Sequence, residues 1–92
     1  YAPLEQYDRN GNHGPWSDVY SMSASIYYLL TGIRIPNARK RQEEDTVQSL
    51  RALGVPISER QDQAILTGLN LEIQGRYQTI GELYFNLYGE RI

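Results

Sequence analysis

The sequence predicts an all-α fold, and three observations support that prediction. The stretch from Gly14 to Gly32, GPWSDVYSMSASIYYLLTG, is apolar or small at nearly every position and has the length of one helix. Capping boxes at Ser58 and Thr79 are each followed by apolar residues at helical spacing. No segment shows the alternation of apolar and polar residues that is typical of a half-buried strand.

The N-terminal third is expected to hold a short helix, a loop and the long helix. Residues 3–9, PLEQYDR, predict the short helix, and residues 10–15, NGNHGP, are loop by composition. Ser17 or Asp18 is placed to cap the long helix, and Gly32 is placed to end it.

The long helix lacks a polar face. One stripe at helical spacing consists of Val19, Met22, Ile26, Leu29 and Ile33. Tyrosines and Leu30 cover much of the remaining circumference, and the other positions are small. Such a helix is buried on all sides in a large core or a membrane, and this one is too short and serine-rich to span a bilayer. The other segments can cover only part of it, so we expect a fragment or an obligate partner.

The middle of the chain is polar, with adjacent blocks of opposite charge. The charged residues are Arg34, Arg39, Lys40, Arg41, Glu43, Glu44 and Asp45. These blocks predict a solvated surface or loop, and a patch for an acidic or phosphorylated partner is the alternative. A modest helix is predicted over residues 46–53, and Gly54 to Pro56 ends it.

The last two helices have the clearest signals. Ser58 and Gln61 form the first capping box, ahead of Ile65, Leu66 and Leu69. Thr79 and Glu82 form the second, ahead of a stripe made of Ile80, Leu83, Tyr84, Leu87 and Tyr88. Gly89 is placed to end that helix.

Composition excludes several classes of function. Nine Lys and Arg against 11 Asp and Glu give a net charge of −2, which argues against nucleic acid and anionic membranes as partners. With no cysteine and one histidine, His13, the chain offers no thiolate metal site and no catalytic triad. Residues 8–14, DRNGNHG, depart from a calcium loop at the sixth and twelfth positions. We expect a soluble, cytoplasmic chain with His13 on a surface loop.

Three blocks carry a resemblance to one family. Tyr1 to Tyr7, YAPLEQY, resembles the end of the activation segment in protein Ser/Thr kinases. Trp16 to Gly32 is similar to the family pattern S-D-V-[WY]-S-L-G-x-x-[LI]-Y-x-[LM]-L-T-G, and Ile65 to Leu83 resembles its closing region. The blocks keep the order and spacing of the family over essentially the whole chain, in a form similar to bacterial kinases of the eukaryotic type.

The resemblance implies a protein-kinase-like fragment of the C-lobe, with a central buried helix and two C-terminal amphipathic helices. Residues 1–92 would be the C-terminal portion of the large lobe, a single incomplete domain. The Gly-rich loop, strand Lys, catalytic-loop Asp and Asn, and Asp-Phe-Gly motif are missing from the sequence. We therefore assign no catalytic, cofactor-binding or metal residue here, and ATP and Mg²⁺ are implied only for the parent domain.

The resemblance pairs two residues that are far apart in sequence. Glu5 matches the Glu that closes the family's Ala-Pro-Glu motif, and Arg76 matches the late Arg that binds it. A planar guanidinium can hold a carboxylate with two parallel hydrogen bonds, which would tie the activation segment to the helices. The alternative is two unrelated surface charges. We predict that Glu5 and Arg76 are in contact.

Two further residues are matched by position. Asp18 corresponds to the Asp that accepts backbone N–H groups of the catalytic loop, although a helix dipole favours an acid there in any case. Without that loop, we expect it to face its own helix end, water or a neighbouring chain. Tyr1 corresponds to the tyrosine that positions the substrate residue after the phosphorylated one, and we expect this terminal residue to fray.

Departures from the family pattern leave the parent's activity open. Pro3-Leu4 stands where the family has Ala-Pro, Ser23 where it has a helix Gly, and Glu72-Ile73 where it has Asp/Asn-Pro.

Two candidate functions are therefore consistent with the sequence. The first is a Ser/Thr kinase fragment that supplies the substrate-side platform for ATP-dependent phosphorylation of proteins. The second is a stand-alone helical interaction module, or a pseudokinase remnant, that binds a protein partner. The missing remainder of the domain, a protein substrate and a second copy bound through exposed core surface are the expected partners.

Overall fold

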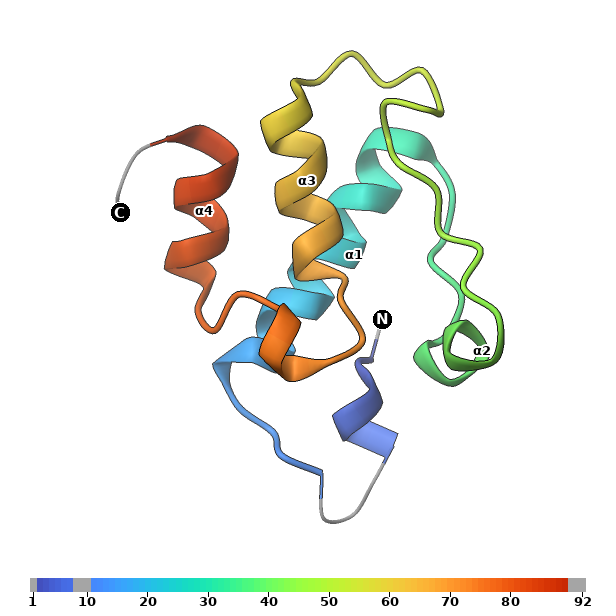
Figure 1. The fold of residues 1–92 in the computed structure, drawn as a ribbon, viewed down its shortest axis with the longest axis vertical. Coiled ribbons are helices and arrows are strands. Elements are labelled where there is room, and N and C mark those ends of the chain that lie inside the picture. The colour runs from blue at the N-terminus through green and yellow to red at the C-terminus, as the bar shows by residue number, and fades with distance from the viewer. Residues whose placement is uncertain (1, 8–10, 90–92) are drawn as a thin grey trace.

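The computed structural model describes residues 2–7 and 11–89, and every regular element in these ranges is a helix (Figure 1). The elements are the 3₁₀-helices η1 (Leu4–Tyr7) and η2 (Ile73–Gly75) and the α-helices α1 (Pro15–Thr31), α2 (Ala38–Glu43), α3 (Glu59–Gly68) and α4 (Ile80–Tyr88). The predicted all-α fold is confirmed. None of the described helices has the length and apolar character needed to cross a membrane.

Helix α1 is central to the arrangement, and α3 and α4 both pack against it and against each other. Figure 1 shows α1 crossing behind α3, with α4 beside α3 and α2 on the opposite side. The buried apolar core consists of Val19, Tyr20, Ala24, Tyr27, Ile35, Leu50, Ala64, Ile65, Leu69, Leu83 and Leu87. The core thus draws on α1, α3 and α4 and on the connections on both sides of α2.

The start of α1 differs from the prediction. Its N-cap is Gly14, with Pro15 in the first turn, so the expected cap at Ser17 or Asp18 is wrong. The Ser17 hydroxyl lies 3.4 Å from the Gly14 nitrogen, and it also donates a hydrogen bond to the carboxylate of Glu5. The predicted end at Gly32 is confirmed, because this residue adopts a left-handed φ of 73° that glycine tolerates best.

The predicted stripe on α1 is wrong, because most of it faces outward. Met22, Leu29 and Ile33 are 46%, 79% and 48% exposed. The buried face instead consists of Ser17, Val19, Tyr20, Ser23, Ala24 and Tyr27. Tyrosine rings and small side chains therefore make the core contact, and the rest of the described chain covers only one side of this helix.

The connection between α1 and α3 also corrects two expectations. The polar stretch contains α2, a helix capped by Asn37, whose side-chain oxygen accepts a hydrogen bond from the Lys40 nitrogen at 2.9 Å. Residues 46–53 do not form the predicted helix: residues 46–49 are irregular, and turns begin at residue 50. The buried Asp62 carboxylate holds them, because it accepts hydrogen bonds from the Leu50 nitrogen at 2.9 Å and from the Ser49 hydroxyl.

Both C-terminal helices begin where the sequence predicts. Ser58 and Gln61 form a reciprocal capping box at the start of α3. The Thr79 hydroxyl accepts from the Glu82 nitrogen at 3.2 Å, while the Glu82 carboxylate turns to the Gln78 nitrogen rather than that of Thr79. Gly89 ends α4 with a left-handed φ of 73°.

Gly68 on α3 lets α3 and α1 approach closely. A Cβ atom at this position would collide with the Ser23 hydroxyl and lie 2.9 Å from the Ser23 Cβ. The Ser23 hydroxyl itself is buried with no hydrogen-bond partner among the described residues. Ser23 and Gly68 therefore fill one tight contact between the two helices.

We expect Gly68→Ala to lower the free energy of unfolding by about 1–3 kcal/mol, because the added methyl overpacks this contact. Adding Ser23→Gly should recover much of the loss, since it removes the colliding atoms. Gly81→Ala on α4, where a Cβ has room, is the matched control and should be neutral or stabilising. Urea unfolding followed by circular dichroism measures all of these, and equal effects of the two alanine substitutions would contradict the packing argument.

Candidate functional site

Glu5 and Arg76 form a buried ion pair that fastens the N-terminal segment to the end of η2. The Arg76 Nη1 atom donates to Glu5 Oε2 at 2.8 Å, and Nη2 donates to Oε1 at 3.4 Å. The Arg76 side chain is 0% exposed and that of Glu5 is 4% exposed. The predicted contact is therefore present, in the bidentate geometry that suits a guanidinium and a carboxylate.

The guanidinium of Arg76 uses all five of its N–H groups. The three that do not reach Glu5 donate to the carbonyl oxygens of Trp16, Asn70 and Leu71 at 3.0, 3.0 and 3.2 Å. Its carbon also lies 5.1 Å from the centroid of the Tyr20 ring. One buried cation thus joins η1, the first two turns of α1 and the loop before η2.

Ser17 and His13 complete the surroundings of Glu5. The Ser17 hydroxyl donates to Glu5 Oε2 at 2.7 Å. The His13 Nε2 atom lies 2.7 Å from the Glu5 carbonyl oxygen, and because a carbonyl only accepts, Nε2 carries the hydrogen. His13 is exposed on a loop, as expected, and yet it contacts the segment that Glu5 holds. We call Glu5, His13, Ser17 and Arg76 the Glu5 anchor.

The Glu5 anchor lowers the pKa of its carboxyl. Burial alone would raise this pKa, but the hydrogen bonds from Arg76 and Ser17 outweigh burial, so the pKa lies below its ordinary value of 4.5. The unfolded chain therefore takes up a proton at a higher pH than the native chain does. The contribution of Glu5 to stability is complete above pH 4.5 and is lost as the pH falls through the lowered native pKa.

We expect the free energy of unfolding to fall as the pH drops below about 4.5, and Glu5→Gln to flatten part of that fall. Asp45 adds to the slope, because hydrogen bonds from Arg41 lower its pKa as well. Urea unfolding across about pH 3 to 7 provides the comparison. Parallel pH profiles for wild type and Glu5→Gln would show that Glu5 does not carry this dependence.

Arg41 is a second buried cation, which corrects the prediction of a solvated charge run. It is 6% exposed, and its Nη1 atom donates to the Tyr20 hydroxyl at 3.1 Å and to the Leu69 carbonyl at 2.7 Å. Nε and Nη2 donate to the two carboxylate oxygens of Asp45 at 3.1 and 3.0 Å. Tyr20 therefore lies between two cations, with Arg76 over its ring and Arg41 at its hydroxyl.

The other predicted site residues lie apart from the Glu5 anchor. Asp18 is exposed in the first turn of α1, facing away from the core. Tyr1 lies outside the described residues. Among the described residues, no group of three or more His, Cys, Asp or Glu side chains is arranged to hold a metal ion. The anchor can thus position a segment of chain.

The helical arrangement matches that of a C-terminal fragment of a kinase domain. One solved structure that it resembles is PpkA-294 in its apo form, a bacterial protein related to Ser/Thr kinases. The two are 32% identical with a TM-score of 0.83, and the match covers 95% of this chain and 30% of that chain. No protein-family model matches the chain, and neither does any curated protein. The likeness supports a kinase-domain fragment.

Proposed function

We propose that this chain is the C-terminal part of the large lobe of a serine/threonine protein kinase. In that domain it supplies the helical platform that holds a protein substrate during ATP-dependent phosphorylation. The observation that carries the proposal is the Glu5 anchor, which fixes the segment Ala2–Tyr7 on the helices through a fully paired, buried Arg76. The likeness to PpkA-294 supports it.

The remainder of the domain is the partner that this proposal requires. The side of α1 that the described chain leaves uncovered carries Met22, Leu29 and Leu30, and Ile33 follows just after the helix; all four are more than 40% exposed. Exposed apolar side chains gathered on one helix mark a surface that packs against further protein. The motifs that hold ATP and Mg²⁺ in protein kinases do not occur in this sequence, so the proposal assigns both ligands to the remainder of the domain.

The first test is the coding sequence upstream of the Tyr1 codon. A His-x-Asp catalytic loop followed by Asp-Phe-Gly is expected, and kinase-like sequence without those aspartates would indicate a pseudokinase. A start codon just before Tyr1 would contradict the proposal and favour the alternative, a stand-alone helical interaction module.

The second test is phosphoryl transfer by the full-length protein. With Mg²⁺ and labelled ATP, we expect transfer to Ser or Thr peptides, a large loss for Arg76→Ala and near-normal activity for Arg60→Ala. Arg60 is a suitable control because it is exposed and, among the described residues, donates to the Asn86 and Phe85 carbonyls on α4. Equal activity of both variants would contradict the role given to the anchor.

A further inference from the structure

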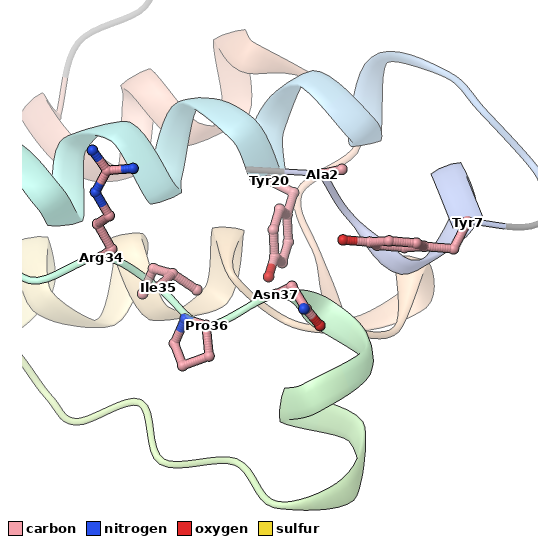
Figure 2. A pocket seen from close by; sticks show the side chains of 7 residues that line it. All are labelled: Ala2, Tyr7, Tyr20, Arg34, Ile35, Pro36 and Asn37. Atoms are coloured by element: carbon pink, nitrogen blue, oxygen red, sulfur yellow. The ribbon is translucent and has the colours of Figure 1, made fainter.

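A pocket of about 220 Å³ lies between the Ala2–Tyr7 segment, α1 and the start of α2 (Figure 2). Its lining residues are Ala2, Tyr7, Tyr20, Arg34, Ile35, Pro36 and Asn37. Ile35 and Pro36 offer apolar surface on one side. Figure 2 shows the hydroxyls of Tyr7 and Tyr20 pointing toward the same space, next to the side chain of Asn37. A short side chain with a polar end suits such a pocket.

The polar groups of the pocket are left as donors. The Tyr20 hydroxyl accepts from Arg41, so its own hydrogen remains to be donated. The Asn37 side-chain oxygen accepts from the Lys40 nitrogen, which leaves the NH₂ group of the amide. The Tyr7 hydroxyl points toward the same space and carries a hydrogen that it can donate. The hydroxyls of Tyr7 and Tyr20 and the NH₂ group of Asn37 can therefore donate into the same pocket. A ligand that accepts hydrogen bonds would match them.

Three arginines lie near these donors, and the charge of one of them, Arg41, is offset by Asp45. Arg41 binds the Tyr20 hydroxyl from behind, and the Arg39 carbon lies 4.9 Å from the centroid of the Tyr7 ring. Arg34 lines the pocket with its stem, while its guanidinium lies 5.5 Å from the centroid of the Tyr28 ring. Within the described chain, only Arg41 of these three forms an ion pair with an acid. The charge of Arg39, which lies over the Tyr7 ring, therefore favours an acceptor that is also an anion.

We propose that this pocket binds the carboxylate of a Glu or Asp side chain in the protein substrate. The proposal rests on the proposed function, because Ala2 directly follows the residue that, by resemblance, positions the substrate after the phosphorylated site. The acidic side chain is therefore expected to lie C-terminal to the phosphorylated Ser or Thr. The volume of about 220 Å³ accommodates a side chain of this size.

The test measures peptide binding to the full-length protein by fluorescence anisotropy. Labelled peptides carry one Ser in a neutral sequence, with Glu at one of the following four positions, and each has a matched peptide with Gln instead. We expect one position at which Glu binds about tenfold more tightly than Gln, the effect of a charge-assisted hydrogen bond. Equal binding of Glu and Gln at all four positions would overturn the proposal.

Two variants locate the effect in the pocket. Asn37→Asp keeps the oxygen that caps α2 but replaces the NH₂ donor with negative charge, so it should abolish the preference for Glu. Tyr7→Phe keeps the ring beneath Arg39 and removes the hydroxyl, so it should reduce the preference by about threefold. Tyr88→Phe, on the 60% exposed Tyr88 of α4, is the control and should retain it. A preference that survives both pocket variants would overturn the assignment.

The binding measurement does not depend on catalysis, so the two proposals fail separately. If the protein transfers no phosphate but prefers Glu through Asn37 and Tyr7, the kinase proposal is wrong and the acid-binding pocket stands. If the protein phosphorylates Ser peptides without any preference for Glu over Gln, the kinase proposal stands and the pocket assignment is wrong.

Discussion

Replacing Arg76 with alanine is expected to lower the free energy of unfolding by about 3–5 kcal/mol. The substitution leaves the Glu5 carboxylate buried without its cation, and it removes the donors to the Trp16, Asn70 and Leu71 carbonyls. The desolvation of an unpaired charge dominates this cost. Urea unfolding at neutral pH, followed by circular dichroism, measures it.

Three further variants test the reason for this effect. Arg76→Lys keeps the charge but cannot form the two-pronged contact, so it should lose less than Arg76→Ala. The double variant Glu5→Gln with Arg76→Met should recover part of the loss, because no uncompensated charge remains. Arg60→Ala, at an exposed position, should cost about 1 kcal/mol. A similar loss for Arg60→Ala and Arg76→Ala would show that the buried ion pair stabilises the fold no more than an exposed arginine does.

Arg41→Ala should lower the free energy of unfolding by about 3 kcal/mol. It leaves the Leu69 carbonyl and the Tyr20 hydroxyl without their donor in a buried position. Arg39, two residues earlier on α2, is the matched control. It is exposed and stacks on Tyr7, so Arg39→Ala should cost about 1 kcal/mol or less. Equal costs at the two positions would contradict the assignment of Arg41 to the core.

The elements that were predicted correctly are those whose signals are local. Ser58 and Thr79 each accept a hydrogen bond from a nitrogen within the first turn of the helix, so α3 and α4 begin as expected. The helix predicted over residues 46–53 was wrong because Asp62, from a later helix, accepts a hydrogen bond from the Leu50 nitrogen. No local pattern in the sequence indicates that bond. The core face of α1 was wrong for the same reason, since its apolar residues on all sides do not show which side meets α3.

The site was predictable only where the family resemblance supplied it. Charge and spacing alone did not distinguish Glu5 and Arg76 from other surface charges, whereas the resemblance placed them in contact. The burial of Arg41 was missed because this residue lies in a run of similar cations. What distinguishes it is its hydrogen bonds to Tyr20 and Leu69, which are distant in sequence. Ser17 and His13 were missed as partners because each reaches Glu5 across a loop of the chain.

The ion pair of Glu5 and Arg76 has a consequence for the order of folding, because the two residues are 71 positions apart in sequence. Closing a loop of that length costs about 4 kcal/mol of chain entropy, whereas α3 and α4 meet through neighbouring segments. We therefore expect the pair to form after the transition state, so that Arg76→Lys speeds unfolding and leaves the refolding rate nearly unchanged in stopped-flow measurements. The segment Ala2–Tyr7 would then dock last and leave first, opening and closing the pocket at Tyr7 while α1, α3 and α4 stay packed.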